Sequence, residues 1–208
     1  MRGLLEAAVA HGTVPGAVAV VGDREQVVPV AALGVTRLGG PSVVAETRYD
    51  LASLSKVLGT LPAVLKLVEA GEVTLASPVR RFFSNAGWFQ NPSLGDVTVQ
   101  QLLTHTGGLP AWKPLYAVAA DRLTALGGTL QTPLERTAGR VVYSDLGFIL
   151  LGATVERVSG TRLDAFTRDH VFGPLGLETL QYGVPSGVSV AATETCGWRG
   201  RLLEGEVH

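Results

Sequence analysis

The spacing of apolar residues changes at Ser53, and this change constrains the possible folds more than any other feature of the chain. Before it, short apolar runs at 16–22 and 26–33 flank the polar segment 23–25, a pattern that predicts an antiparallel hairpin. The first run, bounded by glycines, is typical of a buried strand. Residues 47–51 are predicted to add a further short strand, so the opening of the chain is expected to form sheet.

After Ser53 the apolar residues recur at helical intervals. The first helix is predicted to end at Gly71 and to bend at Pro62, whose ring cannot continue the backbone hydrogen bonds. Thr98 and Gln101 have the spacing of a capping box, in which the two side chains satisfy backbone N–H groups at a helix start. Further helices are predicted around 79–83 and over 97–104, 115–126, 146–158 and 163–171.

Strands followed by a long helical stretch predict an α+β fold, with an antiparallel sheet, flanking helices and an inserted, mostly helical region. We expect a single domain over residues 1–208. Residues 1–55 and 185–208 would form its α/β part, and residues 56–184 its helical part. The tail from 188 to 208 is expected to be extended and loop-like.

Composition argues against several classes of partner. Apolar residues make up 46% of the 208 residues, enough for a sizeable core, and the net charge is −1 without a run of like charges. This pattern does not indicate a nucleic acid or a membrane as partner. The single cysteine, Cys196, cannot form an internal disulfide and is expected to be a small buried residue. The histidines lack metal-ligand spacing, so neither a metal nor another cofactor is expected.

The N-terminal stretch is apolar, but Glu6, His11 and Pro15 interrupt it, which argues against a secretory signal. It predicts an amphipathic helix stopped by Gly12 and followed by a strand. No stretch reaches the ~18 uninterrupted apolar residues that a membrane span needs. The sequence therefore predicts a cytoplasmic protein.

Ser53 and Lys56 stand three residues apart at the predicted helix start. Residues i and i+3 share a helix face, so the hydroxyl and the amine can come within hydrogen-bond reach. A lysine whose pKa is lowered by burial and by the positive end of the helix can take the serine proton. The backbone N–H of Ser53 could then receive a developing oxyanion. The alternative is an ordinary helix start with a solvated Lys56.

A second candidate is the run Tyr143-Ser144-Asp145, which directly precedes the helix predicted over 146–158. Tyr143 could pass a proton to a leaving group, and Asp145 could bind a substrate amide or hold Lys56. The alternative is that Asp145 caps the helix and Tyr143 packs with its hydroxyl outward.

In order and context these residues resemble the serine β-lactamase and penicillin-binding-protein superfamily, in particular its class C-like esterase and carboxypeptidase branch. The family motif S-x-x-K matches SLSK (53–56) within DLASLSK, and Y-x-N matches YSD (143–145) within YSDLGFILLG. The segments VTVQQLLTHTGGLP and TETCGWRGRLLEGEVH also resemble this branch. The resemblance covers nearly the whole chain.

The resemblance implies a β-lactamase/transpeptidase-like fold and a serine hydrolase that works through an acyl-enzyme. Ser53 would be the acylated nucleophile, Lys56 its base, and Tyr143 would share the proton and protonate the leaving group. Asp145 would contact substrate. Trp112 could line the cleft, with core packing as the alternative. The substrate would be an ester, a D-alanyl peptide or a β-lactam, with the first two favoured because no secretory signal is seen.

Two departures from the family pattern bear on activity. Asp145 stands where the motif usually has asparagine, and an ionised carboxylate there would keep Lys56 charged. The third motif, K-T-G or H-x-G on a later strand, is not found, because HTG (105–107) precedes Tyr143 and TCG (195–197) lacks the cation. The alternative function is therefore a truncated or inactive relative that binds ligand without turnover. A purely structural helical domain is a third interpretation.

The sequence stops at His208, before the point where relatives supply that strand, and so it resembles the first part of a longer protein. Its sheet would then have an uncovered edge and one bare face, and such edges pair with other chains. We expect the isolated chain either to form a homo-oligomer or to be poorly stable.

Overall fold

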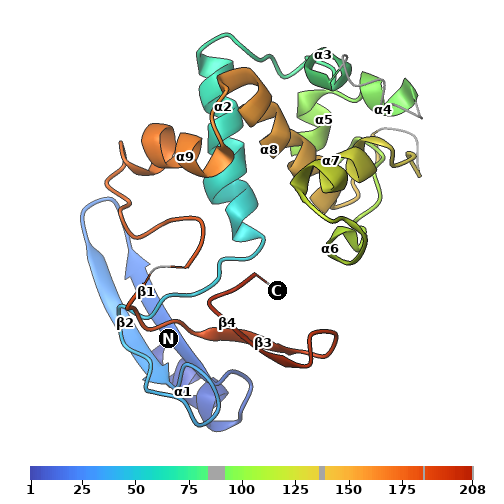
Figure 1. Ribbon diagram of the computed structural model, residues 1–208. Coiled ribbons are helices and arrows are strands. Elements are labelled where there is room, and N and C mark those ends of the chain that lie inside the picture. Colours follow the sequence, from blue (N-terminus) through green and yellow to red (C-terminus); the bar gives the residue numbers. More distant parts are fainter. Residues whose placement is uncertain (84–91, 136–138, 185, 208) are drawn as a thin grey trace. The chain divides into compact units, whose positions relative to one another are not determined.

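The computed structural model describes residues 1–83, 92–135, 139–184 and 186–207. Its contacts divide the chain into two compact units. The strand unit comprises Met1–Ala52 and Tyr182–His208, and the helical unit comprises Ser53–Gln181. Both can be followed by colour and label in Figure 1.

The strand unit begins with a helix and a hairpin (Figure 1). Helix α1 (Arg2–Ala10) leads into β1 (Gly16–Gly22), which pairs antiparallel with β2 (Val27–Gly34). The Asp23 carboxylate accepts two backbone hydrogen bonds of 2.8 and 2.9 Å in the turn and so fixes it. The predicted helix and hairpin are confirmed. The expectation of a buried first strand is wrong, because among the described residues β1 pairs with β2 alone and its last three residues are exposed.

A second hairpin, β3 (Ala192–Cys196) and β4 (Arg201–Glu204), lies in the tail that the sequence predicted only as extended. The short strand predicted over 47–51 is wrong, since this segment makes one isolated bridge. Thr47 instead closes a turn, in which its hydroxyl accepts a 2.9 Å hydrogen bond from the Val44 N–H.

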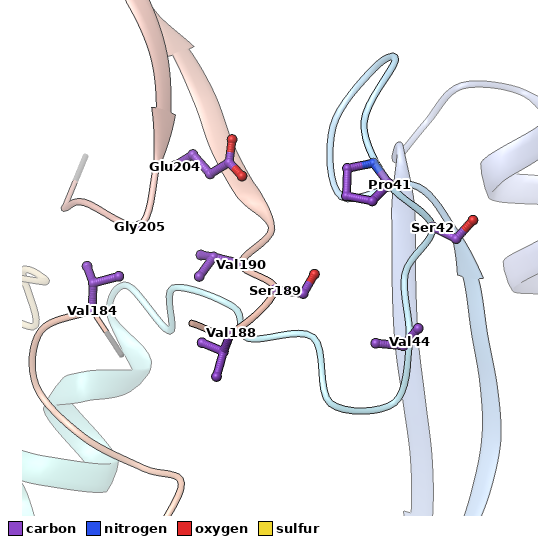
Figure 2. A pocket seen from close by; sticks show the side chains of 9 residues that line it. All are labelled: Pro41, Ser42, Val44, Val184, Val188, Ser189, Val190, Glu204 and Gly205. Carbon is purple, nitrogen blue, oxygen red and sulfur yellow. The ribbon is translucent and has the colours of Figure 1, made fainter. Parts of the chain in front are cut away.

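An open depression of about 600 Å³ lies in the strand unit (Figure 2). Much of its lining is apolar and includes Val44, Val184 and Val190. The Glu204 carboxylate also lines it and pairs with Arg37 at 2.8 Å. The residues predicted for catalysis are not among its lining residues.

The helical unit has helices in the predicted regions, together with a short helix over Pro92–Asp96 that the sequence did not predict. Its elements are η1 (Lys56–Thr60), α2 (Leu61–Glu69), α3 (Arg80–Phe83), α4 (Pro92–Asp96), α5 (Val99–Leu103), α6 (Leu115–Val118), α7 (Arg122–Leu130), α8 (Asp145–Ser159), α9 (Leu163–Thr167) and η3 (Arg168–Phe172). The capping box of Thr98 and Gln101 is confirmed, with both reciprocal hydrogen bonds present. The single helix predicted over 115–126 is wrong. Asp121 interrupts it and caps α7 by accepting a 2.7 Å hydrogen bond from the Thr124 N–H.

The first long helix begins irregularly. In η1, a π turn, the Leu61 N–H donates to the Lys56 carbonyl, five residues back. Pro62 lies in the first turn of α2, which continues directly from η1, so its missing N–H interrupts the backbone hydrogen bonds at this point. The irregularity expected at Pro62 therefore takes the form of a π turn that ends just before it.

The core of the helical unit forms where α2, α5 and α8 meet. Helix α8 runs through it and is buried along most of its length, and Gly160 ends it in the left-handed conformation. Buried side chains from the three helices include Val64, Leu102, Leu150 and Leu151. Their packing fixes the beginning of α8 relative to the beginning of α2.

Candidate active site

The run 143–145 is held where α8 begins. The Ser144 hydroxyl accepts a hydrogen bond from the Gly147 N–H at 3.3 Å and donates to the Pro110 carbonyl at 2.6 Å. The Asp145 N–H donates to the Ala111 carbonyl at 2.8 Å. Ser144 is therefore the helix cap, and the alternative that Asp145 caps α8 is wrong. The Asp145 side chain is left to make another contact.

That contact is with Lys56, at the centre of a cluster of four residues. Lys56 Nζ lies 3.0 Å from Ser53 Oγ and 2.6 Å from Asp145 Oδ1. It also lies 4.9 Å from the centre of the Tyr143 ring, and the Tyr143 hydroxyl hydrogen-bonds with both Lys56 and Ser53. The structure thus brings together four of the five residues singled out from the sequence. Lys56 is not solvated, because its side chain is only 15% exposed.

The charges of this cluster differ from the expected ones. Burial alone would lower the pKa of Lys56, but hydrogen bonds and charge interactions with Asp145 and Tyr143 outweigh burial and raise it. The pKa of Tyr143 is lowered, first by its hydrogen bond with Lys56 and then by that with Ser53. The arrangement therefore favours a protonated Lys56 beside a tyrosine that ionises more readily than usual.

Trp112 does not join this cluster through any described contact. It follows Ala111 in the loop before α6, and it is 58% exposed. The alternative that Trp112 packs in the core is therefore wrong.

His105 is a neighbour that the sequence did not single out for a role. Its ring centre lies 4.5 Å from that of Tyr143, and its Nδ1 accepts a 3.0 Å hydrogen bond from the Ser144 N–H. The sequence holds no spacing signal for this contact, because 38 positions separate His105 from Tyr143.

Replacing Asp145 by asparagine is expected to speed acylation of Ser53 at neutral pH by roughly 3- to 10-fold, since one pKa unit corresponds to a factor of ten. The carboxylate raises the pKa of both Lys56 and Tyr143, so its removal eases proton loss from either group. The rate of covalent labelling of Asp145→Asn measures this. Asp169→Asn, which removes an exposed carboxylate paired with Arg168, is the matched control. An unchanged rate in Asp145→Asn would mean that the carboxylate does not restrain the reaction.

Among the described residues, no cluster of three or more His, Cys, Asp or Glu side chains is arranged to hold a metal ion. None of the helices that they form has the length and apolar character needed to cross a bilayer.

A sequence model of the beta-lactamase family matches residues 1–201. The chain belongs to the beta-lactamase family. Over 178 residues it is 33% identical to a putative D-alanyl-D-alanine carboxypeptidase of Escherichia coli O157:H7. The matched region is 78% of this chain and 40% of that relative. The chain spans about half the length, or less, of the curated relatives that it matches first.

Solved structures of the beta-lactamase family have the same fold. The octameric penicillin-binding protein homologue from Pyrococcus abyssi superposes with a TM-score of 0.75 at 26% identity, over 98% of this chain and 50% of that one. A class C beta-lactamase superposes with a TM-score of 0.79 at 20% identity, over 100% of this chain and 56% of that one. The expected β-lactamase/transpeptidase-like fold is therefore confirmed.

Proposed function

We propose that this chain carries the acyl-transfer centre of a serine hydrolase, in which Ser53 attacks a carbonyl carbon and becomes acylated. The observation that carries the proposal is the position of Lys56 Nζ, 3.0 Å from Ser53 Oγ, with Tyr143 hydrogen-bonded to both. Nucleophilic catalysis by a serine needs neighbouring groups that can accept and return the hydroxyl proton, and Lys56 and Tyr143 are groups of this kind.

Within this proposal, Tyr143 takes the Ser53 proton. Its pKa is lowered and its hydroxyl hydrogen-bonds with Ser53, whereas Lys56 is held as an ammonium. An ammonium has three N–H donors, and here they face Ser53, Tyr143 and Asp145. Lys56 stabilises Tyr143 as the tyrosinate that accepts this proton, and the resulting neutral Tyr143 later passes it to the leaving group. The role of Lys56 as base, inferred from the sequence, would need a neutral amine, which Asp145 opposes.

The proposed substrate is a small ester or a D-alanyl peptide, with a β-lactam as the third choice. Membership of the beta-lactamase family and the carboxypeptidase name of the E. coli relative support this range. The Asp145 side chain is 49% exposed, so it can accept a hydrogen bond from a substrate N–H while it holds Lys56. Trp112 offers an exposed aromatic surface for the rest of the substrate.

Covalent labelling tests the proposal. The protein is incubated with a fluorophosphonate and, separately, with a penicillin, followed by intact mass and peptide mapping. We expect one adduct, on the peptide that contains Ser53, and the reagent that reacts begins to separate esterase from penicillin-binding chemistry. If neither reagent forms an adduct, a relative that binds ligand without turnover replaces the proposal.

We also propose that the chain associates with copies of itself through the hairpin of β1 and β2. Four valines near its turn, Val20, Val21, Val27 and Val28, are 44% to 69% exposed. Among the described residues these two strands pair with no third strand, and an unpaired strand edge can pair with another chain. The Pyrococcus abyssi homologue is described as octameric, which supports association of this kind. Light scattering should therefore give a mass above 21.7 kDa, and a monodisperse monomer would contradict the proposal.

A further inference from the structure

His105 contacts three successive residues of the segment that carries Tyr143. Its backbone carbonyl accepts a 2.8 Å hydrogen bond from the Val142 N–H. Its ring stacks at 4.5 Å and 35° on Tyr143, and its Nδ1 accepts a 3.0 Å hydrogen bond from the Ser144 N–H. The His105 ring also contacts Phe148, whose ring centre lies 5.2 Å away. Main chain and side chain of His105 together therefore hold residues 142–144.

The backbone of His105 is itself in an unusual conformation. Its φ is +57°, in the left-handed region that residues other than glycine rarely adopt. Strain of this kind persists where surrounding contacts over-determine it, and it gathers at functional sites. Here it falls directly after the cap of α5, where the His105 N–H still donates to the Leu102 carbonyl at 3.2 Å. The left-handed turn directs the ring toward the Tyr143 segment.

The contact with Ser144 fixes the protonation state of the ring. A backbone N–H can only donate, so Nδ1 must keep its lone pair, and the neutral ring carries its proton on Nε2. Burial, and then the charge of Lys56, lower the pKa of His105, while the charge of Asp145 raises it in part. Within the described part of the chain, Lys56, Asp145 and Tyr143 are the titratable groups found to interact with the ring.

We propose that His105 is a positioning residue, which holds the Tyr143 hydroxyl against Ser53 and Lys56 only while its Nδ1 accepts the Ser144 N–H. This inference rests on the proposed function. A proton on Nδ1 would place two donors face to face, remove the hydrogen bond and release the segment that carries Tyr143. Acylation should therefore fall at acid pH with the titration of His105, a group that does not itself touch the reacting atoms.

Two variants separate the hydrogen bond to the Ser144 N–H from the ring contact with Tyr143. His105→Asn keeps an acceptor and tolerates the left-handed backbone, but it does not titrate. His105→Phe keeps an aromatic ring and lacks the acceptor. His170→Asn is the matched control, because His170 stacks on Phe166 at 4.5 Å in the same unit and has no described contact with Tyr143.

The first readout is the rate of Ser53 labelling against pH. In the wild type and in His170→Asn we expect an acid limb with its midpoint below 6.5, the ordinary value for histidine, because the pKa of His105 is lowered. His105→Asn should lose the step below 6.5, keep the separate rise with pH that ionisation of Tyr143 causes, and keep at least about a tenth of the rate at pH 8. His105→Phe should be slower by about 10- to 100-fold at every pH, as expected when a catalytic group is misplaced. A step below 6.5 that persists in His105→Asn overturns the proposal.

The second readout does not depend on activity. In an NMR titration of the wild type, the Tyr143 ring and Ser144 amide signals should shift with the midpoint of the His105 ring. If Ser53 is never labelled but these signals titrate together, the proposed function fails and the positioning contact stands. If the Tyr143 signals ignore the His105 midpoint, the positioning role fails whatever the labelling shows. Thermal unfolding followed by circular dichroism establishes beforehand that each variant is folded.

Discussion

Replacing Ser53 by alanine is expected to abolish covalent labelling of the protein by a fluorophosphonate. The reagent needs an oxygen nucleophile that has lost its proton, and Ser53 Oγ is the hydroxyl within 3.0 Å of Lys56 Nζ. Alanine removes that oxygen and leaves the helix start intact, since alanine is a good helix former. Intact mass spectrometry should show the adduct in the wild type and none in Ser53→Ala.

Ser55 supplies the control for this experiment. It lies two residues further along the same turn and is also exposed, but it has no described contact with Lys56 or Tyr143. Ser55→Ala should therefore be labelled at the wild-type rate. Labelling that survives in Ser53→Ala would place the reactive group elsewhere and remove the proposed centre.

Replacing Lys56 by methionine should slow the labelling of Ser53 by roughly 100- to 10,000-fold, the usual contribution of a group that assists proton transfer. Methionine fills a similar volume but cannot donate to Ser53 or stabilise a Tyr143 anion. The pKa of Tyr143 is lowered chiefly by Lys56, so the variant should also need a higher pH to react. In the wild type the rate should rise with pH through a midpoint below 10.0, the ordinary value for tyrosine.

Lys66→Met is the matched control, because Lys66 lies on α2 and pairs at 2.7 Å with Glu69, away from the cluster. Its labelling rate and pH midpoint should equal those of the wild type. If Lys56→Met keeps both within about threefold and a few tenths of a pH unit, Lys56 takes no part in the reaction.

The elements that the sequence predicted well depend on local signals. The first hairpin follows from two apolar runs and a turn in which one side chain, Asp23, satisfies the backbone. Helix α5 follows from the capping box of Thr98 and Gln101, three positions apart. The approach of Lys56 to Ser53 is local as well, because i and i+3 share a helix face. Signals within one turn can be read without knowing the rest of the fold.

The features that the sequence did not predict depend on distant partners. Ser144 and Asp145 are equally good caps by type, and the choice follows from the Pro110 carbonyl, 34 positions away, which accepts the Ser144 hydroxyl. The contacts of His105 with the Tyr143 segment likewise join distant positions. Likewise, the run 16–22 is apolar enough for a buried strand, but burial depends on what packs against it. Such outcomes are decided by packing.

The π turn η1 sets the angle about the helix axis between the Ser53–Lys56 pair and the buried face of α2. A regular α-helix turns by about 100° per residue, and a π turn holds one residue more before the chain returns to the same direction. Ser53 and Lys56 lie at or before this turn, while the buried residues Val64 and Leu67 of α2 follow it. With a regular turn in its place, Ser53 and Lys56 would be rotated by about 100° relative to the buried face of α2. The extra residue therefore sets the direction in which Ser53 and Lys56 point relative to the buried face of α2.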